Sequence, residues 1–276
     1  MLIDLPGQSR SDAIFAYLTG RAIKLAANSL RPFFYCHFWL FPHQRFELTT
    51  RHIERNKAIF IARESGPNSE QIPRIIWQTN YTNKITLPLH AAWRWNRFLS
   101  ANYDYCFHNT EERLVFVEKN FPGTIAKAYH RLTIGAAQAD LWRLLVLYKH
   151  GGVYLDIDAH LVWPLKRITN RMPEIFIRYK NREATNYFIA SRPQNPTIKA
   201  LIEEVLFRIE HSNSNNVYDI TGPSVFEDIL KHRNHYWRFS SHTCLQGNFS
   251  NKFFQYLDKP AGCWTTQQKS QRVVSI

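Results

Sequence analysis

Cysteine is scarce in this chain, and the few cysteines present are scattered. Cys36, Cys106, Cys244 and Cys263 form no CxxC pair and no ladder of short spacings. This pattern indicates reduced thiols in a protein that faces the cytosol, and it argues against a structural zinc site. Acidic residues are also few, because 22 Asp and Glu stand against 35 Lys and Arg and give a formal charge of +13. Such a surface repels itself unless it meets an anionic partner, so nucleic acid, anionic lipid and phosphorylated substrates are all candidates.

Long hydrophobic runs are missing as well. The most apolar stretch, FFYCHFWLF at 33–41, is far shorter than the roughly 20 residues that span a bilayer as a helix. The first residues, MLIDLPGQSR, lack the basic segment and apolar run of a secretory signal. We therefore expect a cytoplasmic protein that is not integral to a membrane. The sequence also shows no internal repeat and no low-complexity tract.

The texture of the sequence changes near residue 56. Residues 1–56 are aromatic, basic and rich in short helical patterns, which is typical of a helical appendage. In residues 57–276, β-rich runs such as KAIFIA, RIIWQT and YDYCFH alternate with helical stretches. One helix is expected to begin at about Thr110, because Asn109 and Glu112 form a capping-box pattern. This alternation predicts an α/β domain with helices on the faces of a sheet.

The segment 137–158, AQADLWRLLVLYKHGGVYLDID, combines a helix, a glycine pair and a strand. The glycines at 151 and 152 are expected to end the helix. Asp140 and Arg143 are three residues apart, so they share one helical face and aim an acid and a guanidinium at one spot. Another face of the same helix carries an apolar stripe at i, i+3, i+4 and i+7, formed by Leu141, Leu144, Leu145 and Tyr148.

The strand that follows carries two carboxylates. Alternation in VYLDID places Tyr154, Asp156 and Asp158 on one face, with the two carboxylates about 7 Å apart. Ionised carboxylates at the end of a buried strand are costly unless a cation pairs with them. A hard divalent cation such as Mg²⁺ or Mn²⁺ meets this need and also binds phosphate oxygens, so it could neutralise charge on a departing diphosphate.

Each of these features can also be explained without any function. An Asp-x-Asp triplet alone is more often a solvated turn than a metal site. A surface salt bridge between Asp140 and Arg143 would contribute little to stability. The combination of the acid–guanidinium pair, the glycine pair and the two carboxylates favours the functional interpretation.

At these residues the chain resembles glycosyltransferase family 32, the DXD-motif sugar transferases that include fungal Golgi mannosyltransferases and bacterial capsule and lipopolysaccharide enzymes. The resemblance implies a GT-A fold, that is, a Rossmann-like domain that binds a nucleotide sugar. It also implies a retaining transfer and a requirement for Mn²⁺ or Mg²⁺. The matching motifs cover roughly residues 70–230 in the family's order: IPRIIWQTN (72–80), YDYCFHN (103–109), ADLWRLLVLYKHGGVYLDID (139–158), NYFIASRPQNPTIKALI (186–202) and TGPSVF (221–226).

The resemblance also implies roles for individual residues. Asp156 is expected near the ribose and the metal, and Asp158 is expected to bind the metal more directly. Asp140 and Arg143 are expected to grip the sugar hydroxyls and the diphosphate side of the donor. The remaining positions expected to contact the donor are Trp77, Gln78, Tyr154 and Trp264.

Some of these residues also have a structural explanation that competes with the functional one. Core packing is a serious alternative for Trp77, because tryptophan is usually largely buried. Asn186 and residues 221–223 match stretches that line the donor and acceptor cleft, but a polar turn explains them equally well.

One position departs from the family pattern. Family members often carry a His-Trp pair near the C-terminus that completes the metal or diphosphate site, whereas this chain has Cys263 followed by Trp264. A neutral thiol is a poor ligand for a hard cation. The third metal ligand is therefore left open between water, a phosphate oxygen, His242 and Gln267, while Trp264 is still expected to cover the diphosphate.

Together these features predict a retaining hexosyltransferase that acts on a glycan or lipid-linked acceptor in capsule or lipopolysaccharide synthesis. No carboxylate is required as a nucleophile, so front-face attack is favoured, with Arg143, the metal and backbone donors stabilising the leaving group. Two alternatives stay open. A degenerate protein that binds sugar nucleotides without turnover is favoured by Cys263 alone. A basic nucleic-acid-binding protein would explain only the charge, and no nucleic-acid module is recognisable.

The aromatic stretch LRPFFYCHFWLF at 30–41 predicts a role for the appendage. It contains Arg31 and follows Arg21 and Lys24. Aromatic and basic side chains together suit the lipid headgroup region, so we expect peripheral contact with an anionic membrane on its inner face. The alternative is a helical cap that buries these aromatics on the catalytic domain, since exposed patches of this size are rare.

Overall fold

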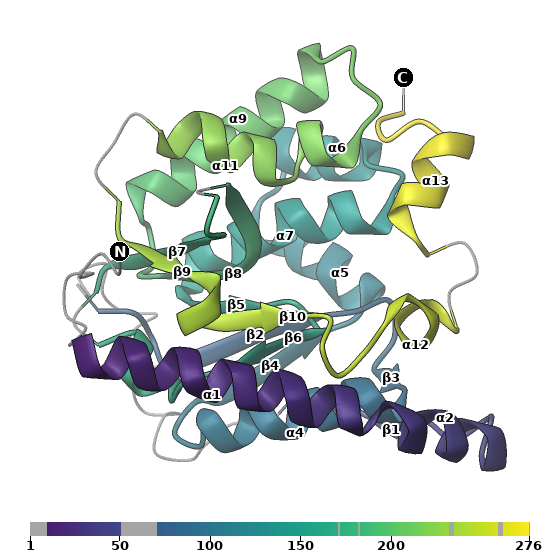
Figure 1. Cartoon of the computed structure of the whole chain (residues 1–276). Coiled ribbons are helices and arrows are strands. Elements are labelled where there is room, and N and C mark those ends of the chain that lie inside the picture. The colour runs from purple at the N-terminus through teal and green to yellow at the C-terminus, as the bar shows by residue number, and fades with distance from the viewer. Residues whose placement is uncertain are drawn as a thin grey trace.

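A six-stranded mixed sheet forms the centre of the protein (Figure 1). The computed structural model describes residues 10–50, 71–170, 172–181, 183–231, 235–258 and 262–275. The strand order is β4-β2-β5-β8-β7-β9, where β4, β2 and β5 are parallel and β8 runs antiparallel to both of its neighbours. The strands are β2 (Ile75–Thr79), β4 (Asp104–His108), β5 (Gly152–Leu155), β7 (Glu174–Arg178), β8 (Ala184–Ser191) and β9 (Trp237–Phe239).

Helices cover both faces of this sheet (Figure 1). One face is covered by α5 (Thr110–Asn120), α6 (Thr124–Arg131), α7 (Gly135–His150), α9 (Pro196–His211) and α11 (Pro223–Leu230). The opposite face is covered by α4 (Leu87–Leu99) and α1 (Arg10–Ser29). The predicted α/β fold class is confirmed, and the mixed sheet with helices on both faces is consistent with the expected GT-A type.

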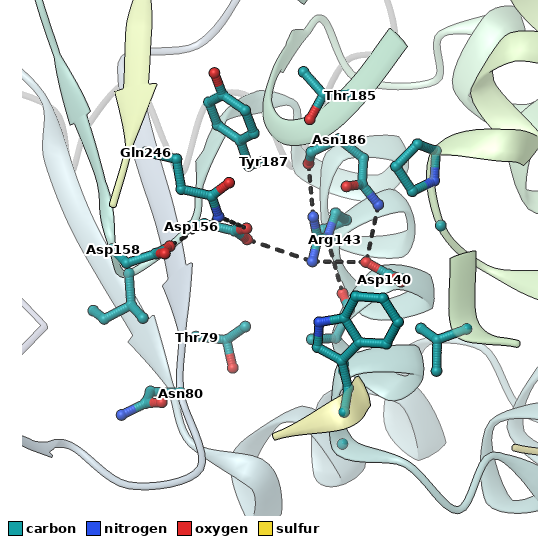
Figure 2. A pocket seen from close by; sticks show the side chains of 18 of the residues that line it. Thr79, Asn80, Asp140, Arg143, Asp156, Asp158, Thr185, Asn186, Tyr187 and Gln246 are labelled. Carbon is teal, nitrogen blue, oxygen red and sulfur yellow. Dashed lines mark hydrogen bonds and ion pairs between the residues drawn. The ribbon is translucent and has the colours of Figure 1, made fainter. Parts of the chain in front are cut away.

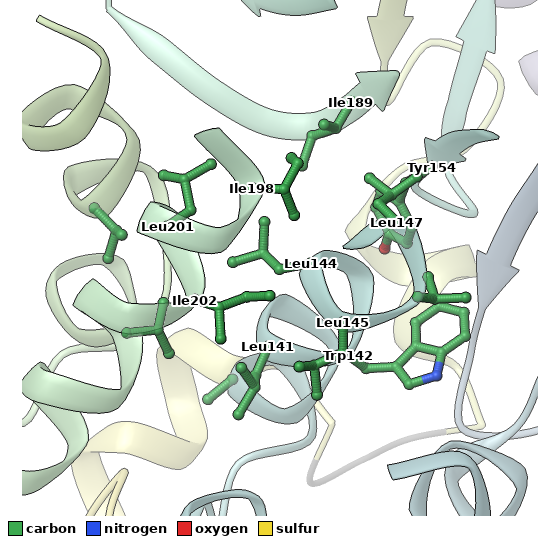
Figure 3. Close-up of a cluster of buried hydrophobic side chains, with 14 of the residues drawn as sticks. Leu141, Trp142, Leu144, Leu145, Leu147, Tyr154, Ile189, Ile198, Leu201 and Ile202 are labelled. Atoms are coloured by element: carbon green, nitrogen blue, oxygen red, sulfur yellow. The ribbon is translucent and has the colours of Figure 1, made fainter. Parts of the chain in front are cut away.

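Helix α7 lies at the centre of the larger hydrophobic core (Figure 3). Every residue from Leu141 to Leu147 is buried, including Trp142 and Arg143. The prediction of a single apolar stripe on this helix must therefore be corrected, because its buried residues lie on all sides. Because α7 is enclosed by α5, α9, α10 (Val217–Ile220) and the sheet, it carries buried side chains all round, and the stripe is only part of its buried surface.

The two glycines after α7 have backbone angles that favour glycine. Gly151 has φ of 65° and ends the helix with its N–H on the carbonyl of Leu147, and Gly152 has φ of 106°. A Cβ at Gly152 would lie 2.7 Å from the carbonyl oxygen of Ile75 on the neighbouring strand. The glycine pair thus lets the chain turn directly from α7 into β5, at the centre of the sheet.

Gly152→Ala is expected to lower the free energy of unfolding by about 3 kcal/mol, because it combines backbone strain with a backbone clash. Gly123→Ala is the matched control, since Gly123 also has φ of 83° but a Cβ there meets no atom within 4 Å. The control should lose only about 1 kcal/mol. Urea unfolding measures both variants, and equal losses would show that the close approach to Ile75 does not constrain the fold.

Smaller elements surround the main sheet. A ribbon of β6 (Ala159–Leu161) and β10 (Cys244–Gln246) follows the β5 turn, and β1 (Phe46–Glu47) pairs with β3 (Lys84–Ile85). The remaining short elements are α8 (Leu165–Ile168), α10 (Val217–Ile220), the 3-10 turn η1 (Ser240–His242), α12 (Lys252–Tyr256) and α13 (Trp264–Ser270). The β6–β10 ribbon matters most for the site, because its register places Gln246 opposite Ala159.

The N-terminal helices α1 and α2 (Arg31–Leu40) pack on the domain near α4 (Figure 1). Their buried residues are Ala16, Ile23, Ala27 and Phe34, which join a cluster with Ala92, Val162, Phe249 and Phe254. The predicted boundary at 56 and the expected strand at 57–62 lie outside the described residues. None of the helices in the described part of the chain has the length and hydropathy needed to cross a bilayer.

Candidate active site

A pocket of about 710 Å³ opens at the carboxyl ends of β2 and β5 (Figure 2). Thr79 and Asn80 line it from the end of β2, and Asp156 and Asp158 line it from the turn after β5. Ligands of open α/β sheets bind at this edge of the sheet. A pocket of this size is within the ordinary range for a small-molecule site.

A buried ion pair forms one wall of the pocket. Asp140 and Arg143 are only 6% and 5% exposed, and their side chains are joined by an ion pair of 2.8 Å. Arg143 also lies 3.4 Å from Asp156 and donates to the backbone carbonyl of Asn186 at 2.6 Å. Its guanidinium stacks over the Tyr154 ring, 4.3 Å from the centroid. The pair is therefore a buried link between α7 and Asp156. It is not the surface salt bridge that was the alternative to a functional role.

Asp140 brings together three segments that are far apart in the sequence. Its carboxylate accepts hydrogen bonds from Asn186 Nδ2 at 3.0 Å and from Thr221 Oγ1 at 2.9 Å (Figure 2). Burial raises the pKa of Asp140 to about 6, although Arg143 and these two donors favour the charged form. Asn186 and Thr221 therefore fix the orientation of an acid whose charge is expensive at this depth.

Asp140 is expected to make folding pH-dependent. Its folded pKa of about 6 lies above the unfolded value of about 3.9. The stability it contributes is therefore fully present below about pH 4 and is lost as the pH rises through about 6. Between pH 4 and 7 the wild type should lose roughly 3 kcal/mol relative to Asp140→Asn. Urea unfolding of both proteins across this range measures the difference, and parallel curves would contradict the raised pKa.

The two carboxylates after β5 share a neutral partner. Gln246 Nε2 donates to Asp156 at 3.1 Å and to Asp158 at 3.0 Å, so one amide group bridges both side chains (Figure 2). Tyr154 Oη donates to the other oxygen of Asp156 at 2.6 Å. Burial raises the pKa of the Tyr154 hydroxyl, which therefore stays protonated as a donor. The oxygens of Asp156 and Asp158 thus converge on one point of the pocket.

The backbone reaches this arrangement differently from the prediction. Strand β5 ends at Leu155, and Asp156 begins a turn in which its carbonyl accepts from the N–H of Ala159 at 3.0 Å. Asp158 therefore does not continue the strand, because the chain leaves the main sheet there to pair with β10. Tyr154, Asp156 and Asp158 still line one pocket, as predicted. The two carboxylates, however, are brought together by the turn and by Gln246, and not by alternation along a strand.

The donor set fits a hard divalent cation. Two carboxylates that converge on a single N–H donor present their lone pairs to a common position, where Mg²⁺ or Mn²⁺ would take oxygen ligands. Within the described ranges, no three His, Cys, Asp or Glu side chains gather closely enough to hold a metal. A cation would thus complete its shell with the amide oxygen of Gln246, water or donor phosphate.

Trp77 and Gln78 lie just before the pocket. Trp77 is 4% exposed, and its indole N–H donates to the carbonyl of Gly151 at 2.8 Å. Gln78 is also buried and donates to the backbone carbonyl of Asp156 at 3.2 Å. Neither is among the described residues that line the pocket, which starts at Thr79. Trp77 matches the core-packing alternative, and Gln78 supports the turn that carries Asp156.

The C-terminal segment also contributes to the lining of the pocket. Trp264 and Gln267 of α13 line the pocket, as do Gly222 and Pro223. His242 is 4% exposed and packs its ring against Tyr17 and Phe239, away from the described lining of the pocket. Of the two side chains left open as a third ligand, the structure therefore places only Gln267 in the pocket.

Gln246 is the main site residue that the sequence did not indicate. It lies 88 residues after Asp158 and reaches the carboxylates only because β10 pairs with β6. No motif surrounds it, so no local signal could have identified it. The hydrogen bond from Thr221 to Asp140 was also not predicted, although both residues belong to quoted motifs.

Comparisons with known proteins agree with this site. Residues 89–174 match a family model described as "Glycosyltransferase sugar-binding region containing DXD motif". The chain is 25% identical to the Initiation-specific alpha-1,6-mannosyltransferase of Schizosaccharomyces pombe, over 70% of this chain and 54% of that protein. It is 28% identical to the Uncharacterized glycosyltransferase L373 of Acanthamoeba polyphaga mimivirus, over 58% of this chain and 64% of that protein. The chain thus spans somewhat more than half the length of these relatives.

Two further similarities are more limited. The chain is 33% identical to the Inositol phosphoceramide mannosyltransferase 3 of Schizosaccharomyces pombe, over 33% of this chain and 25% of that protein. Among solved structures, the PaToxG Glycosyltransferase aligns with a TM-score of 0.48 and 20% identity, over 64% of this chain and 74% of that one.

The fold and the site define an α/β protein with a ligand pocket at the carboxyl ends of β2 and β5. The matched region holds Asp140, Arg143, Asp156 and Asp158, four of the residues that line the pocket. Residues 89–174 thus match the DXD sugar-binding region of glycosyltransferases, and the similarity to the Schizosaccharomyces pombe and mimivirus proteins agrees with the resemblance to family 32 seen in the sequence.

Proposed function

We propose that this protein is a retaining glycosyltransferase that moves a hexose from a nucleotide-sugar donor to a hydroxyl group of a glycan or lipid-linked acceptor. The observation that carries the proposal is the continuous set of contacts from Asp140 through Arg143 to Asp156, beside Asp158 in one pocket. Mannose is the first sugar to test, because two of the similar proteins are named as mannosyltransferases. The site of sugar transfer would be the pocket at the ends of β2 and β5.

Asp156 and Asp158 would hold a Mn²⁺ or Mg²⁺ ion, with Gln246 turned to offer its amide oxygen. When bound, such an ion supplies Lewis-acid stabilisation of the diphosphate. Trp264 lies on the opposite wall of the pocket and would cover the donor. Excluding water in this way strengthens the electrostatic interactions inside the site.

Arg143 acts as a positioning residue in this proposal. Each nitrogen of its guanidinium already has a protein acceptor: Ala139 O, Asn186 O, and the carboxylates of Asp140 and Asp156. A group so fully engaged has little capacity to grip the donor directly. It instead holds Asp156 at a fixed place and supplies a buried positive charge next to the leaving group. Front-face attack on the sugar remains the favoured course of the reaction.

Surface polysaccharide synthesis, of capsule or lipopolysaccharide, is the proposed setting, with the protein peripheral on the inner face of a membrane. Its net charge of +13 and the aromatic residues of α2 support contact with anionic lipid. A nucleic-acid partner is not part of the proposal.

A second candidate is a degenerate protein that binds sugar nucleotides without turnover. It is favoured by Cys263, which replaces the expected histidine, and by the lack of a third acidic or imidazole ligand among the described residues. This candidate shares the donor pocket but not catalysis, so binding and turnover must be measured separately.

A donor-hydrolysis screen tests both candidates. A panel of UDP- and GDP-hexoses is incubated with the protein in Mn²⁺, in Mg²⁺ or in EDTA, and the released nucleoside diphosphate is measured. The proposal expects release from one donor that stops in EDTA. Binding of a donor without release by any metal would favour the degenerate protein. Equal release in EDTA would contradict the metal assignment.

A further inference from the structure

Arg113, near the start of α5, is a second buried arginine in the lining of the main pocket. Arg113 and Arg143 are the basic side chains of its described lining, and Arg113 is only 3% exposed. Arg143 pairs with Asp140 and Asp156. In contrast, no carboxylate in the described part of the chain lies within ion-pair distance of Arg113. The pocket wall thus contains a positive charge that the described residues leave without a counter-charge.

Among the described residues, Arg113 also leaves most of its hydrogen-bonding capacity unused. A guanidinium carries five N–H donors in a planar fork. That of Arg113 donates from Nη2 to Thr110 Oγ1 at 3.2 Å, and its buried Nε has no acceptor within the described structure. Native proteins pair nearly all of their buried polar atoms. Free donors of a residue that lines a pocket therefore indicate a ligand that accepts from them.

The groups around Arg113 do not supply the missing negative charge. Tyr129, Tyr154, Arg143 and Asp140 act on it electrostatically, and the effect of Asp140, the one carboxylate among them, is the smallest of the four. Both tyrosine hydroxyls stay protonated, because burial raises their pKa. Burial also lowers the pKa of the Arg113 guanidinium, but the group remains charged at neutral pH.

The two arginines of the pocket are therefore in different states. The nitrogens of Arg143 already have protein acceptors, so this residue belongs to the fixed frame of the site. A buried charge without a partner costs free energy that a bound anion can offset. Arg113, and not Arg143, is thus the cation with N–H donors available to a ligand.

The surroundings of Arg113 indicate the chemistry of that ligand. Asp140 is the carboxylate that acts on Arg113, whereas Asp156 and Asp158 converge on Gln246. Arg113 therefore lies on the Asp140 side of the pocket. A planar fork of N–H donors matches the paired oxygens of a phosphate or a carboxylate in both geometry and charge.

We propose that Arg113 is a donor-binding residue, whose free N–H groups take an oxyanion of the sugar nucleotide on the Asp140 side of the pocket. The inference rests on the proposed function and names a residue that holds the charge of its donor. One source of the oxyanion is the diphosphate. The other is a carboxylate on the sugar ring, as in a hexuronic acid, and Arg113 would then select acidic sugars over neutral ones.

Titration calorimetry in Mn²⁺ tests the proposal on the wild type and on Arg113→Gln. The probes are UDP, GDP, UDP-glucose, UDP-glucuronic acid, GDP-mannose and GDP-mannuronic acid. Glutamine can still donate to Thr110, but it lacks the charge and the fork. The probe that the wild type binds most tightly should bind the variant about thirtyfold more weakly, because its oxyanion loses charge-assisted hydrogen bonds.

The same titrations distinguish the two sources of the oxyanion. If the diphosphate lies at Arg113, the free nucleoside diphosphate should lose as much affinity in Arg113→Gln as its sugar nucleotide does. If a sugar carboxylate lies there, binding of the free nucleotide should not change. The wild type should then prefer the acidic sugar to the neutral one on the same nucleotide by about thirtyfold, and the variant should lose this preference.

Arg238→Gln is the matched control. Arg238 is 6% exposed and donates to Thr243 Oγ1 at 3.2 Å, but it lies outside the described lining of the main pocket. It should bind each probe as the wild type does. Arg113→Lys is a second variant, which keeps the charge and loses the fork, so its affinity should lie between those of the wild type and Arg113→Gln. Urea unfolding of each variant establishes that it is folded.

Unchanged binding of every probe by Arg113→Gln would overturn the proposal, and so would an equal loss of affinity in Arg238→Gln. If Arg113→Gln does not fold, Arg113→Lys decides, and wild-type affinity for every probe in that variant would be the contradicting result. A wild type that binds none of the probes would refute the proposed function itself, because no donor would then occupy the pocket.

Discussion

Asp158→Asn is expected to reduce sugar transfer by about a thousandfold, because it removes a charged ligand from the position where negative charge of the diphosphate must be stabilised. The free energy of unfolding should stay the same or rise slightly, since Asp158 is 6% exposed and lies beside a second carboxylate. Initial rates of transfer and urea unfolding measure the two effects. A large loss of rate with an intact fold would locate the effect in the site.

Glu203→Gln is the control for this substitution, because Glu203 on α9 is exposed and, among the described residues, its ion pair is with Lys199 at 3.6 Å. It should retain the wild-type rate. If Asp158→Asn also retained it, the two carboxylates would not form the metal site. If Asp158→Asn unfolded the protein, Asp156→Asn would provide the same test, because the Asp156 side chain is 23% exposed.

Arg143→Lys is expected to lower kcat by about a hundredfold with little change in the KM of the donor, because a residue that positions Asp156 affects the transition state more than donor binding. Lysine keeps the charge but loses the planar fork that joins Asp140, Asp156 and Asn186 O. The free energy of unfolding should fall by about 3 kcal/mol, since buried acceptors are left without donors. Steady-state kinetics and urea unfolding measure both quantities.

Arg208→Lys is the matched control for Arg143→Lys. Arg208 also has several acceptors, with Glu204 at 2.6 Å, Asp228 at 2.5 Å and the carbonyl of Asp219 at 2.6 Å, but it lies away from the described lining of the pocket. Its variant should lose stability and keep its rate. A large rise of the donor KM in Arg143→Lys would show that Arg143 grips the donor, and a normal rate would remove it from the site.

The parts of the site that lie close together in the sequence could be predicted. Asp140, Arg143, Asp156 and Asp158 belong to one helix–turn–strand unit, where helical spacing and a glycine pair decide which side chains meet. The capping box at Asn109 is confirmed for the same reason, since both of its hydrogen bonds span three residues. Short-range geometry is fixed by backbone dihedral angles, which the residue types largely determine.

The parts that depend on long-range packing could not be predicted. Gln246 reaches Asp158 only through the pairing of β10 with β6, and Thr221 reaches Asp140 from a loop 81 residues away. Trp77 points into the core and not into the pocket, because the pocket begins only at the end of β2. Alternation along a strand states which residues share a face but not where the strand leaves the sheet, so Asp158 was wrongly placed on a continuing strand.

In the N-terminal helices, too, the local structure could be predicted from the sequence but the packing could not. Their helical character follows from the sequence, but the sequence alone left membrane contact and capping as equal alternatives. In the structure, small residues of α1 pack on the domain while its large apolar residues stay exposed. The buried face thus caps the domain, as one alternative expected, while membrane contact by the exposed face stays a prediction.

Calorimetric titration of the nucleoside diphosphate of the hydrolysed donor tests the central claim most directly. Binding to the wild type is expected in Mn²⁺, and it should be lost in EDTA and in Asp158→Asn even when Mn²⁺ is present. Binding of equal strength in EDTA, or in Asp158→Asn, would show that the two carboxylates do not hold a metal on the diphosphate.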